Sequence, residues 1–250
     1  MYYYIYDEFI QDKRYEKELI RIENRLADLG ITGKISRLAL FRDPTEMIAD
    51  EVSRGVSTVV AVGNDQTVRK IIDVVADQNV IFGLIPLGTP NNLAKLLGLP
   101  EGVPACDILS ARSIETIDLG SVNGRRFISG LSVPNFSAEI TYDGKFKIEP
   151  ARPGTLEIRN LAGAEISRET LADPRDGLFE TTIRVGLKKG WNFFKKQKYG
   201  ESLLTSRRLA IRSREPISLI ADGEEMIDKR FDIRMNPQPL QVITSRRRMF

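Results

Sequence analysis

The sequence predicts an α/β protein in which a doubly wound parallel-sheet domain is followed by a β-sandwich domain. Between residues 56 and 98, two short apolar runs each lead through a glycine turn into a stretch with helical spacing. After about residue 112, short β-type runs joined by hairpin turns replace this alternation. Continuous apolar strands that alternate with helices belong to parallel sheets covered on both faces, and such sheets bind ligands at the carboxyl ends of their strands.

The first part of the chain is expected to alternate between strands and helices. Residues 1–5 predict a strand, and residues 14–29 predict an amphipathic helix that Gly30 closes. Residues 37–41 predict the second strand. A second helix is expected to open at Asp43, because a proline follows at the first helical position and a glutamate follows three residues after the cap.

The first apolar run, residues 56–62, leads through a turn into a helical stretch over residues 68–75. The turn consists of Gly63, Asn64, Asp65, Gln66 and Thr67. Amides at a helix N-terminus attract anions because they lack partners and carry the positive end of the helix dipole, so the helix from Thr67 onward is a candidate phosphate seat. Asp65 would repel a phosphate unless a divalent cation lies between them or its carboxylate caps helix amides. A purely structural N-cap is the alternative interpretation of this turn.

The second apolar run, residues 80–85, is followed by a similar turn and by a helix that ends at Gly98. Thr89 is a good N-cap and Pro90 a good first helical residue, so this helix is expected to begin there. That arrangement also fits a purely structural role. Both glycine turns are expected at one edge of the sheet, and two such turns on neighbouring strands indicate a binding site more strongly than one.

Hairpin signals dominate the sequence after residue 112. Asn123-Gly124 and Asp143-Gly144 are strong two-residue turn signals. The stretches that predict strands are residues 155–158, 178–185, 209–212 and 217–220. A last run, residues 240–244, can return to either domain. We therefore expect domains over residues 1–112 and 113–235, with residues 236–250 able to rejoin the first.

Composition excludes several classes of function. The chain has 250 residues, of which 42% are hydrophobic and 28% charged, as is ordinary for a soluble protein. Because it contains no histidine and only one cysteine, Cys106, imidazole chemistry, histidine-activated nucleophiles, intrachain disulfides and thiolate-rich metal sites are excluded. Catalysis would have to use carboxylates, lysines, backbone amides or an oxygen-bound metal. Without an apolar run of about 18 residues or a secretion signal, the chain is expected to be cytoplasmic.

Residues 186–200 combine basic and aromatic side chains and contain no acidic residue. The segment includes Lys188, Lys189, Lys195, Lys196, Lys198, Trp191, Phe193, Phe194 and Tyr199. Such a mixture suits the surface of an anionic membrane, where each nearby lysine adds about 1 kcal/mol of attraction. Single-stranded nucleic acid would suit the same composition, and so would a plain surface loop. Residues 246–248, three arginines, either extend this basic character or form a solvated tail.

Five landmarks, in one order over most of the chain, resemble the diacylglycerol kinase catalytic-domain superfamily, which includes sphingosine kinases and bacterial lipid kinases. Residues 63–67 resemble its GGDGT loop, and residues 86–95 resemble its PLGTGNDxAR segment. Residues 117–124 are similar to the family's entry into its second domain. Residues 176–180 and 221–224 resemble its DGxLD and DGE elements.

The resemblance implies an NAD kinase-like or diacylglycerol kinase-like α/β domain that binds nucleotide, a β-sandwich domain for substrate and metal, and an active cleft between them. It implies that ATP is the phosphate donor, that Mg2+ assists, and that a DGE carboxylate is the base on a lipid hydroxyl. Glu224 would be this base, and Asp222 would orient it or the metal. The implied nucleotide-binding residues are Gly63, Asn64, Asp65, Gln66, Thr67 and Thr89. Asp176 would hold a structural magnesium ion with the backbone carbonyls of Asp173 and Leu178.

Simpler structural interpretations of these residues remain open. Asp222-Gly223 and Asp176-Gly177 are both strong hairpin signals, and the first would leave Glu224 merely solvated. Asp118 can pair with a nearby arginine.

Several residues depart from the family pattern. Asn64, Gln66 and Pro90 stand where the family has glycine. Asparagine visits left-handed backbone conformations readily, but a positive φ at Gln66 would cost about 1 kcal/mol, and Pro90 removes an amide donor. The family also has an Asn-Pro-x-x-Gly phosphate loop after its first strand. Asp7 and Glu8 occupy that place here, and their charges would repel a phosphate.

Three functional hypotheses follow. The first is an ATP- and Mg2+-dependent lipid kinase that phosphorylates a diacylglycerol-like or long-chain lipid at the inner face of the membrane, with residues 186–200 as peripheral contact and no nucleic-acid partner. The second is a degenerate member that binds nucleotide or lipid without phosphoryl transfer, which Gln66, Asp7 and Glu8 favour. The third is a kinase with a soluble substrate, since the GGDGT-like loop also resembles that of NAD kinases.

Overall fold

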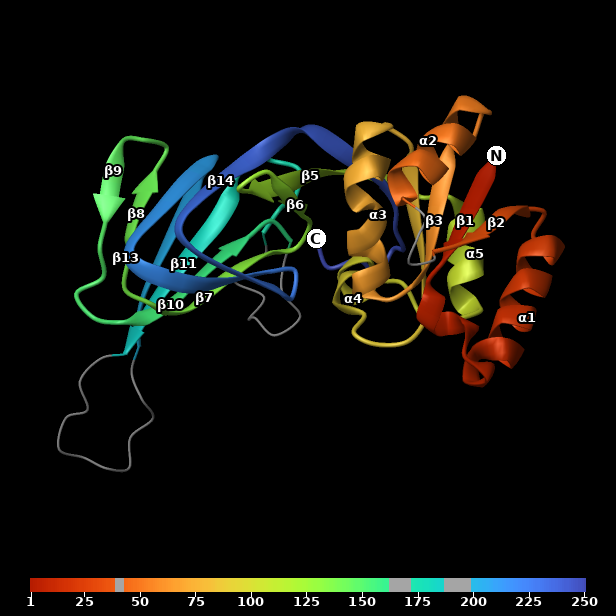
Figure 1. Cartoon of the computed structure of the whole chain (residues 1–250), viewed down its shortest axis with the longest axis horizontal. Coiled ribbons are helices and arrows are strands. Elements are labelled where there is room, and N and C mark those ends of the chain that lie inside the picture. The colour runs from red at the N-terminus through yellow and green to blue at the C-terminus, as the bar shows by residue number, and fades with distance from the viewer. Residues whose placement is uncertain (39–42, 162–171, 187–198) are drawn as a thin grey trace. The chain divides into compact units, whose positions relative to one another are not determined.

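The computed structural model describes residues 1–38, 43–161, 172–186 and 199–250. The chain forms two compact units (Figure 1). The first contains Met1–Ile117 together with Gln238–Phe250, and the second contains Asp118–Pro237.

The first unit is built on a parallel sheet. Its strands are β1 (Tyr2–Tyr6), β2 (Gly33–Arg37), β3 (Thr58–Gly63), β4 (Ile81–Pro86) and the last residues of β14 (Glu224–Ile243). They lie in the order β14, β4, β3, β1, β2, and each neighbouring pair is parallel. Nearly every residue of β3 and β4 is buried, as expected for central strands covered on both faces.

Helices cover both faces of this sheet. They are α1 (Lys13–Asp28), α2 (Pro44–Ser53), α3 (Asp65–Asp77), α4 (Asn92–Leu97) and α5 (Pro104–Ala111), with the 3-10 helix η1 (Glu8–Gln11) before α1. Within this unit, α1 and α5 lie on one side of the sheet, and α2 and α3 lie on the other (Figure 1). Tyr4, Tyr6 and Val60 of the sheet belong to the same apolar cluster as Ile22 of α1 and Leu109 of α5. The predicted doubly wound α/β fold is therefore confirmed.

Two local predictions in this unit were wrong. The second strand is Gly33–Arg37 rather than residues 37–41, and residues 39–42 lie outside the described part of the chain. This strand is mostly exposed at the edge of the sheet, so it lacks the apolar run by which a buried strand is predicted. The helix after the second glycine turn begins at Asn92, with Asn91 as its N-cap, rather than at Thr89 and Pro90.

The second unit consists of antiparallel strands. These are β6 (Arg125–Phe127), β7 (Gly130–Phe136), β8 (Glu139–Tyr142), β9 (Phe146–Ile148), β10 (Gly154–Arg159), β11 (Phe179–Gly186), β12 (Tyr199–Ser206), β13 (Arg208–Ala221), most of β14 and the end of β5 (Ile114–Val122). The main path runs β12, β11, β10, β7, β13, β14, while β8 pairs with β13 and β9 pairs with β8. One apolar cluster, which includes Phe136, Leu156, Phe179 and Phe231, forms its core.

Both predicted hairpin turns of this unit join neighbouring strands. Asn123-Gly124 joins β5 to β6, and Asp143-Gly144 joins β8 to β9. The stretches at residues 209–212 and 217–220 form one long strand, β13, whose pairing with β14 shifts register between Arg212 and Ile217. The intervening exposed residues broke the alternation that the sequence pattern depends on.

Candidate functional site

Three strands of the first unit end at one edge of the sheet and place polar residues there. Asp7 follows β1, Asn64 follows β3, and the segment from Leu87 to Asn91 follows β4. Because these strands are parallel neighbours, their carboxyl ends bring the three segments together. The candidate nucleotide-binding residues of the sequence lie at this edge.

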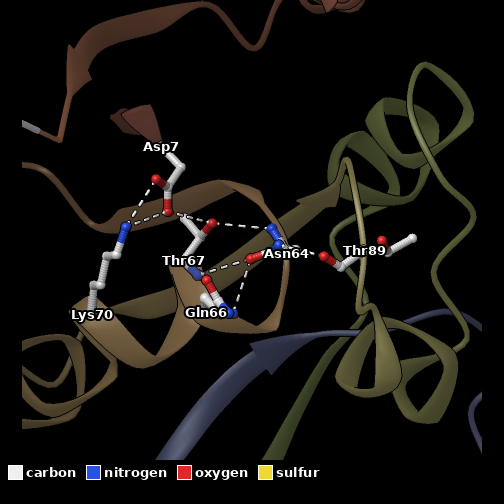
Figure 2. A network of polar contacts seen from close by, with 6 residues as sticks. All are labelled: Asp7, Asn64, Gln66, Thr67, Lys70 and Thr89. Atoms are coloured by element: carbon white, nitrogen blue, oxygen red, sulfur yellow. Dashed lines mark hydrogen bonds and ion pairs between the residues drawn. The ribbon is translucent and has the colours of Figure 1, made fainter. Parts of the chain in front are cut away.

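Asn64 caps helix α3 and fixes the first glycine loop (Figure 2). Its side-chain oxygen accepts hydrogen bonds from the amides of Gln66 (3.0 Å) and Thr67 (3.3 Å), and its own amide donates to Thr67 Oγ1 (3.0 Å). Gly63 is required beside this capping box, because a Cβ there would lie 2.1 Å from Thr67 Oγ1. Asn64 has φ −115° and Gln66 is helical, so neither position needs the left-handed backbone that the sequence left open.

Asp65 caps the neighbouring helix α4. Its two carboxylate oxygens accept hydrogen bonds from the amides of Asn92 (2.8 Å) and Leu93 (3.1 Å). The amide of Asp65 donates to Pro90 O (2.9 Å), and the side-chain amide of Asn64 donates to Thr89 O (2.8 Å). These four hydrogen bonds, together with the one from the amide of Leu87 to Gly63 O (2.8 Å), join the first glycine loop to the second loop and to α4. Asp65 therefore acts as a helix cap, as one of the two interpretations of the sequence proposed, but the helix that it caps begins 27 residues later.

The contacts around α3 change the expected location of a phosphate seat. The first amides of α3 already have hydrogen-bond acceptors. The amide of Asp65 donates to the carbonyl of Pro90, and the amides of Gln66 and Thr67 donate to the side chain of Asn64. In the part of the chain that the structure describes, the backbone N–H groups of Gly88, Thr89 and Asn91 have no hydrogen-bond partner. Unpaired donors at a strand end can accept a phosphate, so the second loop is better suited to this role than the helix from Thr67 onward.

Asp7 lies buried beneath the first loop as part of an ion pair. Its side chain is 2% exposed, and Lys70 Nζ lies 2.9 Å from both of its carboxylate oxygens (Figure 2). Thr67 Oγ1 donates a further hydrogen bond to Asp7 (2.8 Å). The expectation that Asp7 presents a repelling charge to a phosphate was therefore wrong, because Lys70 compensates the carboxylate. Sequence inspection missed Lys70, which lies 63 residues away along the chain and carries no local signal.

The predicted base, Glu224, is the first residue of β14 in the second unit. Its side chain is 44% exposed, and Arg125 Nη1 lies 3.3 Å from its Oε1. Asp222 forms the preceding turn with φ 45°, and its carboxylate accepts hydrogen bonds from the amides of Ile128, Ser129 and Gly130. Burial raises the pKa of Asp222, and these three donors act in the opposite direction. The turn is thus tied to the start of β7, which fixes the backbone that carries Glu224.

The predicted metal-binding residues lie before β11. Asp176 accepts a hydrogen bond from the amide of Leu178 (2.9 Å), and Arg175 Nε lies 2.8 Å from Asp173 Oδ1. Asp118, missed as a member of this group, accepts from the amide of Gly177 (2.8 Å) rather than pairing with an arginine. Burial together with Asp176 and Asp173 raises the pKa of Asp118, and the same causes raise that of Glu180 to about 7.

These carboxylates fit a hard divalent cation, because a positive charge would relieve their mutual repulsion and oxygen donors suit magnesium. Within residues 1–38, 43–161, 172–186 and 199–250, no three aspartate, glutamate or cysteine side chains cluster closely enough to hold a metal. A cation here would consequently draw on backbone carbonyls and water as well as on Asp176.

Other sequence expectations have simpler outcomes. Of the basic segment at residues 186–200, residues 187–198 lie outside the described part of the chain. Arg248 forms an ion pair with Glu115 (2.7 Å), so it is not part of a solvated tail. None of the described helices is long and apolar enough to span a membrane.

Comparisons with known proteins show which family the chain resembles. Residues 2–122 match the model of the diacylglycerol kinase catalytic domain. The diacylglycerol kinase of Bacillus subtilis is 27% identical over 139 residues, which are 54% of this chain and 46% of that protein. The protein named Probable lipid kinase YegS-like of Pseudomonas aeruginosa is 30% identical over 101 residues, which are 40% of this chain and 33% of that protein. These alignments span less than half the length of the relatives.

A solved structure shows the same fold over the whole chain. A crystal structure of a diacylglycerol kinase from Bacillus anthracis covers 99% of this chain and 97% of its own, with a TM-score of 0.76 and 17% identity. At that identity the likeness concerns the fold alone. The match to the diacylglycerol kinase catalytic domain thus covers residues 2–122, just under half of the chain, and the fold of a diacylglycerol kinase is shared over nearly all residues.

Proposed function

We propose that this protein is a lipid kinase that transfers the γ-phosphoryl group of ATP to a hydroxyl of a diacylglycerol-like or long-chain lipid. The observation that carries the proposal is the pair of joined loops at the sheet edge, where Gly88, Thr89 and Asn91 offer unpaired amides. Phosphoryl transfer needs mainly positioning and charge neutralisation, so backbone donors and cations suffice for a chain without histidine. The family match and the similarity to lipid kinases supply the reaction class.

In this proposal, the phosphates of ATP bind the amides of the second loop. Lys95, one turn into α4 and exposed, supplies a nearby positive charge. Glu224 takes the proton of the lipid hydroxyl. The hydroxyl oxygen then forms a bond to the γ-phosphorus, and the bond between that phosphorus and the β–γ bridging oxygen breaks to release ADP. A magnesium ion, when bound, neutralises phosphate charge, and Asp65 retains free lone pairs beyond its two accepted hydrogen bonds for such a contact.

A test must separate catalysis from folding, because Asp65 caps a helix. We would incubate the protein with labelled ATP, Mg2+ and mixed lipid micelles, beside Glu224→Gln and Asp65→Asn. Asp65→Asn keeps an acceptor for α4 but loses the charge. Transfer of label to lipid that falls by about 100-fold or more in Glu224→Gln, with unchanged thermal stability, is the expected result. Equal labelling by Glu224→Gln and the parent protein would refute the role of Glu224.

Binding without transfer is the second candidate, and two observations favour it. Both carboxylate oxygens of Asp65 are used as a cap, and Asn92 takes the place of the aspartate in the PLGTGNDxAR pattern. This candidate predicts saturable binding of an ATP analogue with no label in lipid. Loss of analogue binding in Thr89→Pro, which removes one of the loop amides, would locate that binding at the second loop.

A further inference from the structure

The sheet of the second unit carries four exposed arginines on one face. Along β13 and β14, side chains alternate between the core and solvent. Leu209, Ile211, Phe231 and Ile233 are buried in the core cluster. The arginines that flank these buried residues on each strand are all exposed: Arg208, Arg212, Arg230 and Arg234. They therefore share the outer face.

The register places these arginines opposite one another. Arg208 pairs with Arg234, and Arg212 pairs with Arg230. Like charges directly opposite in a sheet are destabilising, so an anion is expected between them. Asp232 forms ion pairs with both arginines of the first pair, at 3.4 Å from Arg208 and 3.1 Å from Arg234. These contacts lower the pKa of Asp232.

The second pair has no such counter-charge. Among the described residues, no carboxylate lies within ion-pair distance of the guanidinium group of Arg212 or Arg230. Glu139 is the neighbour of Arg212 on β8, but it forms an ion pair with Lys147 (3.0 Å). The pair at residues 212 and 230 thus keeps an unneutralised charge at the surface.

We propose that this face, which we call the arginine face (Arg208, Arg212, Arg230 and Arg234), docks on an anionic lipid bilayer. Arginine side chains bind phosphate groups with two hydrogen bonds each, so Arg212 and Arg230, which lack a carboxylate partner in the part of the chain that the structure describes, can hold lipid headgroups. The choice of a lipid over another polyanion rests on the proposed function, whereas the description of the arginine pairs is independent of it.

The test measures vesicle binding by the full-length protein and requires no enzymatic activity. Vesicles of phosphatidylcholine with phosphatidylglycerol would be sedimented with the parent protein and with Arg212→Gln/Arg230→Gln. Two basic residues, each worth about 1 kcal/mol at such a surface, correspond to a roughly 30-fold loss of partitioning. Added salt should shrink this loss because it screens the arginines.

The matched control is Lys13→Gln/Lys17→Gln, which removes the same charge from exposed positions on α1. An equal loss of binding in both double variants would overturn the arginine face, as would equal binding to vesicles of phosphatidylcholine alone. Tighter binding to single-stranded RNA than to anionic vesicles would do so too. Label transfer in detergent micelles by a protein that ignores vesicles would leave the proposed function standing and remove only this inference.

Discussion

At the scale of single residues, distant partners decide what the glycine loops can do. The sequence allowed Asp65 to be a phosphate-site ligand or a cap, and the structure makes it a cap for a helix 27 residues later. It also expected the α4 cap at Thr89, because local patterns show only local caps. Asp7 was misread for the same reason, since its partner Lys70 is 63 residues away. Long-range polar contacts of this kind leave no spacing signal in one sequence.

Removing the cap at Asp65 should lower stability even without any ligand. Asp65→Ala leaves the amides of Asn92 and Leu93 without their acceptors, and a lost cap costs about 1 kcal/mol. Asp65→Asn should cost less. Urea unfolding of the nucleotide-free protein measures both. Asp50→Ala, an exposed aspartate inside α2, is the control and should change stability by less than about 0.5 kcal/mol. Equal stability of Asp65→Ala and the parent would show that the cap contributes nothing.

The ion pair under the first loop should behave as a coupled unit. Lys70→Met strands the buried Asp7 carboxylate and should destabilise the protein by about 2 kcal/mol, a value below that of a fully buried pair because Lys70 is 47% exposed. Asp7→Asn still accepts from Thr67 and should cost less. The double variant should lose clearly less than the sum of the two single losses, as a double-mutant cycle from urea unfolding would reveal. Additive losses would show that the two side chains act independently.

At the scale of elements, apolar periodicity located the buried strands and failed at the sheet edge. β1, β3 and β4 are buried and lie within about two residues of their predicted positions. β2 is exposed and contains a lysine, a serine and an arginine, so apolar periodicity did not predict it. Side-chain contacts partly replace apolar burial there: Lys34 of β2 reaches Glu51 of α2 (2.5 Å), and Arg54 contacts the same carboxylate (2.6 Å).

This contact should make stability depend on acid pH. The hydrogen bond from Lys34, helped by Arg54, lowers the pKa of Glu51, whose side chain is 7% exposed. A glutamate with a lowered folded-state pKa stabilises the fold above its ordinary pKa of about 4.3, and this contribution is lost as pH falls through the folded value. Glu51→Gln should therefore be less stable than the parent at neutral pH, and the difference should shrink below about pH 4.

Urea unfolding at several pH values measures this difference. Glu46→Gln, at an exposed position in the same helix, is the control. A difference between parent and Glu51→Gln that stays constant from neutral to acid pH would show that the carboxylate charge is not responsible.

At the scale of the whole molecule, the chain leaves the first unit and comes back to it. The sequence left the run at residues 240–244 free to join either domain, and the structure places it beside β4 through the pairing of Val242 with Phe82. Residues beyond it bind α4: the amide of Ser245 donates to Leu97 O (3.1 Å), and that of Met249 donates to Leu96 O (2.9 Å). The helix that Asp65 caps at its start is thus held at its end by the last residues of the chain.

A chain that stops after Pro237 should consequently lose the first unit selectively. It lacks Leu240, Val242 and Ile243, all buried in the first unit, and leaves the edge of β4 unpaired. Hydrogen exchange should speed up in peptides from β3 and β4 and stay slow in peptides from β7 and β10, whose core residues lie in the second unit. A chain that stops after Met249 is the control and should match the full-length protein. Equal loss of protection in both units would mean that they unfold together, in which case the return of the last strand stabilises the entire molecule.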